Sequence, residues 1–170
     1  PINCCDAHPY QQCTHDNNKK FVATLKNWSA LTDSLYIWHY NTDFGHYLMP
    51  FPDFKEFPAD ARMYKNNGVI GIFFQGAYAP GGGGSDAELR SYVMAKLLWN
   101  LKTDTDATVT EWMQGVYGPA WKPMREYFDL MHALVAAPDQ HLFIYESPTP
   151  ARFTPAFLAR SNELFEEAEK

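Results

Sequence analysis

The chain has 170 residues, enough for one domain with its own hydrophobic core. Hydrophobic residues make up 46% and charged residues 20%, a balance typical of a globular protein. The net charge of −6 argues against a nucleic-acid partner, because binding phosphates requires a basic patch. No apolar run approaches the length of a membrane-spanning helix, so we expect no membrane partner. Aromatic residues reach 16%, which fits either a well-filled core or a surface that stacks on sugar rings.

The first half of the chain alternates short apolar runs with amphipathic segments. The runs predict strands, and apolar residues at helical spacing predict helices between them. In chain order we expect the end of a strand at 1–5, a helix at 17–32, a strand at 35–40, a helix at 57–66, a strand at 69–74 and a helix from about 85 to 100. This alternation predicts an α/β fold with a parallel sheet and right-handed crossovers. Three such strands leave both sheet edges unpaired, so we expect missing chain or another copy to complete the sheet.

The stretch 68–100 is the most informative βα unit. Residues 69–74 are continuously apolar, which predicts a strand buried on both faces, and the glycines at 81–84 predict a loop without the ending of a phosphate-binding P-loop. Ser85 or Asp86 is expected to cap the helix that follows. Ligands of such units gather beyond the carboxyl end of the strand, where Gln75 and Tyr78 lie.

The second half of the chain is predicted to be helical. Helices are expected from about 104 to 116, 121 to 136 and 154 to 169, with an extended connector at 141–145. We therefore divide the chain into βα units at 1–100 and a helical extension at 101–170 that packs on them.

Polar residues after the predicted strands are the candidates for chemistry. Asp43 follows the strand at 35–40 and either activates water as a catalytic carboxylate or bonds its own backbone as a turn residue. Asp6 is a second, weaker catalytic candidate. The residues expected to bind substrate are Gln75, Tyr78, His46, Tyr47, Tyr40 and His8, with Trp38 and Phe44 as further stacking or core rings. Gln75 is equally suited to bonding backbone groups at the strand end.

Cysteines and histidines gather near the N-terminus. Cys4, Cys5, His8, Cys13 and His15 suggest a zinc site, but adjacent cysteines depart from the CxxC spacing of structural sites. We therefore expect no metal and no cofactor, and interpret the cysteines as small buried hydrophobes, with a disulfide to Cys13 or a Cys nucleophile beside His8 as alternatives.

Several long blocks resemble one bacterial family. They are CCDAHP at 4–9, LYIWHYNTDFGHYLMPFP at 35–52, GVIGIFFQGAY at 68–78, AELRSYVMAKLLWN at 87–100, GVYGP at 115–119, the helix at 121–134 and the tail at 154–169. The family is known only as domain of unknown function 4838. Its domain is longer than this chain, so the resemblance implies that the chain is the C-terminal part. The resemblance also favours a secreted or periplasmic location.

That family is in turn similar to the α-glucuronidase glycoside hydrolases, which carry a (β/α)8 barrel of the TIM type. KLLWN at 96–100 resembles the end of the helix after their last barrel strand. The resemblance implies that the chain holds barrel strands six to eight, with basic carboxylates near Asp6 and Asp43, although Asp43 stands where those enzymes carry a Glu. Their general acid lies on an earlier strand, outside this chain.

We therefore expect a glycoside-hydrolase-like protein that hydrolyses a poly- or oligosaccharide with carboxylate assistance when full length, and an isolated chain that is inactive. The alternatives are a carbohydrate-binding module without turnover and a structural fragment with no site of its own.

Overall fold

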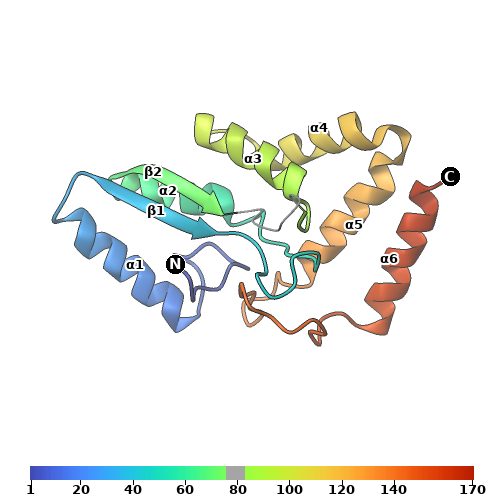
Figure 1. The fold of residues 1–170 in the computed structure, drawn as a ribbon, viewed down its shortest axis with the longest axis horizontal. Coiled ribbons are helices and arrows are strands. Elements are labelled where there is room, and N and C mark those ends of the chain that lie inside the picture. Colours follow the sequence, from blue (N-terminus) through green and yellow to red (C-terminus); the bar gives the residue numbers. More distant parts are fainter. Residues whose placement is uncertain (76–82) are drawn as a thin grey trace.

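A computed structural model of the chain describes residues 1–75 and 83–170. In chain order the elements are α1 (Asp16–Ser29), β1 (Leu35–Tyr40), α2 (Phe57–Asn66), β2 (Val69–Gln75), α3 (Ala87–Trp99), α4 (Thr105–Tyr117), the short 3-10 helix η1 (Gly118–Ala120), α5 (Trp121–Ala133) and α6 (Pro155–Ala168) (Figure 1). The fold is mixed α/β, as the sequence predicts. None of the helices that the structure describes is both long enough and apolar enough to cross a bilayer.

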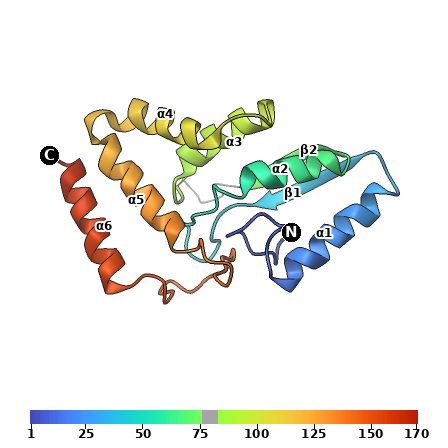
Figure 2. The ribbon, with the colours of Figure 1, turned by 180° about the vertical axis from the view of Figure 1, so that it is seen from behind.

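The sheet formed by the described residues consists of β1 and β2, which run parallel, as predicted. Side chains of one sheet face pack on α1 and α2, in a cluster that includes Ile37 and Ile72 of the strands. In Figure 1, α2 lies behind the strands, and the reverse view of Figure 2 shows it in front of them. The opposite face carries exposed Tyr36, Trp38 and Phe73. One face of this sheet is therefore open to solvent within the described part of the chain.

The strand expected at 1–5 does not form; these residues make turns. The reason is Asn18 of α1, which is fully buried and bonds both backbone groups that a strand would use for pairing. Its side-chain oxygen accepts from the Cys5 backbone N–H at 2.7 Å, and its amide donates to the Cys5 carbonyl at 2.9 Å. With both groups occupied, Cys5 cannot pair with a neighbouring strand through its backbone.

The helices form a chain of packed neighbours that runs away from the sheet. Helix α3 packs on α2 and α4, α4 packs on α5, and α5 packs on α6 (Figure 1). The apolar side of α3 fills the core together with α2, α4 and α5, through residues such as Leu89, Val93, Leu97 and Val109. Apolar residues of α3 therefore contact several neighbouring helices.

The connector at 141–145 has no strand, but its backbone joins two distant loops. The Leu142 carbonyl accepts from the Asp6 N–H, and the Ile144 carbonyl accepts from the Phe44 N–H, both at 2.8 Å. It therefore holds the loop before α1 and the loop after β1 together.

Candidate functional site

Several carboxyl groups are buried together beside the carboxyl end of β1. They are Asp6, Asp53, Glu56 and Asp60. Burial, followed by repulsion from the other carboxyls, raises the pKa of Glu56 well above its usual value. Both Glu56 oxygens are without a hydrogen-bond partner among the described residues. Uncharged, protonated carboxyls are the physically reasonable state for much of this cluster.

Asp6 is bound from one side only. Its Oδ1 accepts from the Tyr10 hydroxyl at 2.7 Å, while its Oδ2 has no partner in the described part of the chain. Burial raises the pKa of Asp6 well above its usual range, against the lowering effect of the Tyr10 bond. This carboxyl can therefore hold a proton at higher pH than an exposed aspartate. It is only 1% exposed, so a substrate cannot reach it on the surface described here.

Asp43 has both oxygens committed to backbone amides. Its Oδ1 accepts from Gly45 N–H at 2.8 Å and from His46 N–H at 3.2 Å, and its Oδ2 accepts from Glu146 N–H at 3.3 Å. The side chain is fully buried. Asp43 therefore bonds its own turn, as predicted for a turn residue, and also bonds the connector. These bonds hold the loop after β1 in place.

Asp53 forms a buried ion pair with Arg90 of α3. The guanidinium donates from Nη1 to the Asp53 carboxylate and from Nη2 to the Phe51 carbonyl at 3.1 Å, and it lies 4.6 Å from the centre of the Phe54 ring. Burial raises the pKa of Asp53, while the attraction of Arg90 acts in the opposite direction. Neither residue was singled out from the sequence, yet a charged residue within the apolar run of α3 is a signal for a buried partner.

His39 of β1 lies next to this cluster. Its Nδ1 is 2.8 Å from the Tyr64 hydroxyl, its ring stacks on Tyr10, and its Nε2 is unpartnered among the described residues. Burial lowers the pKa of His39 to about 3, so the ring is neutral across the physiological range.

A continuous row of aromatic rings runs from the open sheet face onto the loops. Each ring lies within 6.3 Å of the next, centre to centre, in the order Phe73, Trp38, Tyr40 and Phe44, and Phe44 then contacts both Tyr47 and Tyr145. We call these six residues the aromatic row. Trp38, Tyr40, Phe44 and Tyr47 were identified from the sequence, and the structure brings them together.

Phe73 and Tyr145 were missed. Phe73 stands opposite Trp38 in the parallel register, so strand alternation contains the information needed to find it. Tyr145 lies about a hundred residues along the chain from Phe44, and no local pattern predicts that contact.

Gln75 fixes one ring of the row. Its side-chain oxygen accepts from the Trp38 indole N–H at 2.7 Å, across the two strand ends. Gln75 and Tyr40 are paired in register, so the amide and both rings share the open face. Among the described residues the Gln75 amide nitrogen has no acceptor, so it is a potential donor to a ligand.

The other predicted binding residues are not members of the row. His46 is half-buried in the loop held by Asp43. His8 places its Nε2 3.1 Å from the carbonyls of both Ala137 and Gln140, on the side of the connector. Tyr78 lies outside the described residues.

The cysteines gather with a histidine that the sequence did not suggest. One sulfur each from Cys5 and Cys13 and one ring nitrogen of His141 lie within 4.8 Å of one another. All three cysteines are free thiols, so the disulfide alternative is absent here. Burial raises the pKa of the Cys4 thiol to about 12, whereas an activated cysteine nucleophile has a lowered pKa.

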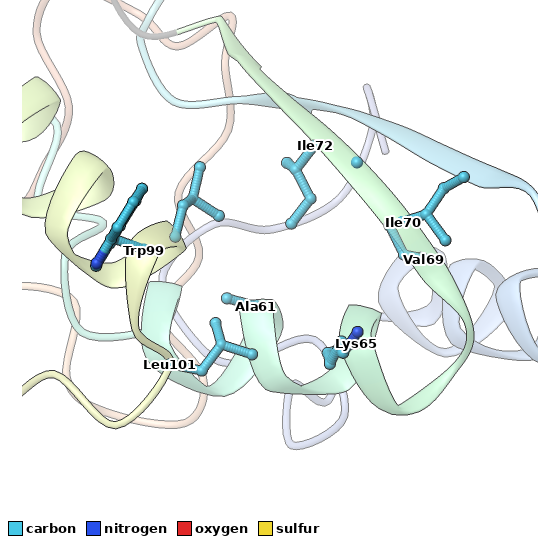
Figure 3. Close-up of a pocket in the computed structure, with 9 residues that line it drawn as sticks. Ala61, Lys65, Val69, Ile70, Ile72, Trp99 and Leu101 are labelled. Atoms are coloured by element: carbon cyan, nitrogen blue, oxygen red, sulfur yellow. The ribbon is translucent and has the colours of Figure 1, made fainter.

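The cavity drawn in Figure 3 lies elsewhere. It has a volume of about 430 Å³ and lies between α2, the first half of β2 and the end of α3, with Ile70, Trp99 and Leu101 in its lining. It is thus at the amino end of β2, away from Asp6 and Asp43. Its lining is mostly apolar, and Trp99 is 93% exposed there.

Comparison with known proteins gives one match. A family model described as a domain of unknown function (DUF4838) matches residues 1–129. No curated protein and no solved structure matches the chain significantly. The match extends from the N-terminal loop into α5 and covers well over half of the sequence. The chain therefore belongs to the DUF4838 family.

Proposed function

We propose that this chain forms the saccharide-binding side of a glycoside-hydrolase-like protein. The observation that carries the proposal is the aromatic row, which begins on the open sheet face and continues past the carboxyl end of β1 onto the loops. Trp38 and Phe73 are 56% and 55% exposed, and Gln75 holds the indole in place. Rigid exposed rings beside amide and hydroxyl groups are suited to the apolar faces and hydroxyls of sugars.

We further propose that the two strands belong to a (β/α)8-type barrel completed by further chain or by another copy. Three features support this. The strands are parallel, α1 and α2 cover a single face, and the apolar cavity of Figure 3 lies along the free edge of β2. A further βα unit would pair with that edge and cover Ile70 and Trp99. The aromatic row would then line the inside of the barrel mouth.

In this proposal the two acidic residues have different roles. Asp43 shapes the loop through three backbone bonds, whereas Asp6 has a raised pKa and, among the described residues, one oxygen without a partner; proton exchange between Asp6 and a substrate requires a conformation that exposes this carboxyl. The similarity to α-glucuronidases would place a general acid on an earlier strand. Because Asp6 is buried, we expect no hydrolysis by the isolated chain, and this burial also favours the second candidate function, saccharide binding without turnover.

Saccharide binding is tested with Trp38→Ala and with Trp28→Ala as the matched control. The two tryptophans are 56% and 57% exposed, but Trp28 belongs to α1, which packs on the opposite face of the sheet from the row. Neutral xylo-oligosaccharides and glucuronoxylan fragments are titrated into the full-length protein by calorimetry. We expect Trp38→Ala to weaken binding at least about tenfold, since a stacked ring contributes on the order of 1 kcal/mol beyond its buried area, and Trp28→Ala to leave it unchanged. Equal effects of the two variants, or no binding at all, would refute the proposal.

Catalysis is tested separately on the full-length protein with aryl glycosides and glucuronoxylan fragments. Loss of turnover in Asp6→Asn, with saccharide binding retained, supports the acid–base role. Asp43→Asn is expected to lower both thermal stability and activity, because it removes a charged acceptor from three N–H groups. Binding without any turnover by the wild type would leave the non-catalytic module as the function.

A further inference from the structure

We propose that Cys5, Cys13 and His141 bind one zinc ion. Cys5 and Cys13 belong to the loop before α1, and His141 begins the connector more than 120 residues later. The Cys5 sulfur lies 3.3 Å from His141 Nδ1. The site is distinct from the aromatic row and from Asp6, and its argument does not depend on the proposed function.

The spacing of the three donor atoms suits a tetrahedral ion. With Zn–S and Zn–N bonds of about 2.3 and 2.0 Å, a tetrahedral angle places sulfur and nitrogen roughly 3.5 Å apart and two sulfurs roughly 3.8 Å apart. The observed 3.3 Å and the limit of 4.8 Å for all pairs are close to these values. Only shifts of a few tenths of an ångström to about one ångström are needed, within the reach of side-chain rotation.

The chemical type of the three donor atoms determines which metal ion would bind. Two thiolates and an imidazole are soft and borderline ligands that favour zinc, whereas calcium and magnesium require oxygen donors. Three protein ligands leave a fourth tetrahedral position for a solvent molecule or for His15. The His15 ring packs edge-on against His141 with centres 5.1 Å apart, and its Nδ1 accepts from the Asn17 N–H, which fixes the ring.

The surroundings hold the donors in position. The buried Asn18 side chain bonds both the backbone N–H and the carbonyl of Cys5. The Ala7 N–H donates to the Cys5 sulfur at 3.5 Å. Such an N–H···S bond stabilises a metal-bound thiolate. The Cys13 N–H is bound to the Pro9 carbonyl at 2.9 Å, and the Asp6 bond to Leu142 brings the connector alongside. Each ligand is therefore preorganised by backbone contacts of its own.

Zinc at this position would act structurally. It would join the N-terminal loop to the connector at the point where Asp6 and Leu142 already pair. Because the ion binds the folded chain and has no preformed site in the unfolded one, it would raise the stability of the folded state.

The test uses the full chain, purified in a non-thiol reductant, stripped with a chelator and titrated with Co²⁺ and then Zn²⁺. We expect one equivalent of Co²⁺, with the absorption bands of tetrahedral cobalt and of thiolate-to-cobalt charge transfer, and displacement by Zn²⁺. His141→Ala and Cys13→Ser should each weaken Co²⁺ binding more than about tenfold. Cys4→Ser is the matched control, since Cys4 is also buried, but its sulfur contacts the Asn17 carbonyl and lies outside the donor group.

Circular dichroism without metal establishes that each variant is folded. His141 is only partly buried, so its replacement is the variant best tolerated by the fold. The proposal is overturned if the reduced wild type binds no stoichiometric metal, or if His141→Ala binds as tightly as the wild type. A Cys5–Cys13 disulfide in the protein as isolated, found by mass spectrometry and unaffected by zinc during expression, would equally overturn it.

Discussion

The buried ion pair between Arg90 and Asp53 gives the sharpest prediction about stability. Arg90 is 1% exposed and donates to the Asp53 carboxylate and to two carbonyls, Phe51 at 3.1 Å and Ser85 at 3.3 Å. Arg90→Met keeps most of the apolar volume but removes the charge and all of these donors. Removing one partner of a buried pair costs about 3–5 kcal/mol. For a chain of this size we expect the melting temperature to fall by roughly 10 °C.

The pH dependence of this effect has a definite sign. Without Arg90, only the hydrogen bonds from Asn41 and the Asp53 backbone oppose the effect of burial, so the pKa of Asp53 rises further above that of the unfolded chain. The folded variant then binds a proton more tightly than the unfolded chain, so its stability falls as pH rises above about 4. The deficit of Arg90→Met relative to the wild type should therefore be larger at pH 7 than at pH 4.5.

Urea unfolding followed by circular dichroism measures both quantities. Arg160→Met serves as control, because Arg160 pairs with Glu126 and Glu163 on the surface, and such pairs contribute about 0–1 kcal/mol. Adding Asp53→Asn to Arg90→Met should recover part of the loss by removing the uncompensated charge. If Arg90→Met is no more destabilising than Arg160→Met at pH 7, the reasoning about a desolvated pair is wrong.

Three smaller predictions follow from backbone and ring geometry. Gly68 has a φ of +74°, so Gly68→Ala should lower the free energy of unfolding by about 1 kcal/mol even though a Cβ meets no atom there. Gly115→Ala, inside α4 with open space around it, should raise it by about 0.5–1 kcal/mol; thermal unfolding of both variants gives the opposite signs directly. Burial lowers the pKa of His132 to about 4 while its Nδ1–H donates to the Phe128 carbonyl at 2.7 Å. The unfolded chain therefore takes up this proton first, and stability due to His132 is lost as pH falls from about 6.5 to 4; His132→Gln should show a smaller fall in melting temperature between pH 7 and 5.

The sequence was informative wherever one local pattern decided the outcome. The sequence predicted each α-helix that the structure describes, and α2 matches its expected bounds of 57–66; the short 3-10 helix η1 was not predicted. Helix α1 ends at Ser29, three residues before the predicted 32. The chain forms a tighter turn there, in which the Leu31 N–H donates to the Trp28 carbonyl. The parallel pairing of β1 and β2 followed from their separation by a helix.

The sequence was least informative where distant residues compete for the same backbone groups. Of the two predicted caps of α3, Asp86 occupies the N-cap position, without a side-chain bond; Ser85 has capping-box spacing with Glu88, but its hydroxyl accepts from the Phe51 N–H instead. The contribution of His141 to the cysteine group likewise depends on the path of the connector. Neither contact can be predicted from a short window of sequence.

The position of the connector determines where proteins of this family can be shortened for recombinant expression. The family match stops at residue 129, inside α5, yet the backbone of 142–146 supplies partners for Asp6, Asp43 and Phe44. A protein shortened to the matched region would leave the Asp6 and Phe44 amide groups and one Asp43 carboxylate oxygen without these partners, and would free both loops beneath the aromatic row. Recombinant pieces intended to keep this region intact should extend beyond Arg152, whose guanidinium anchors Glu146.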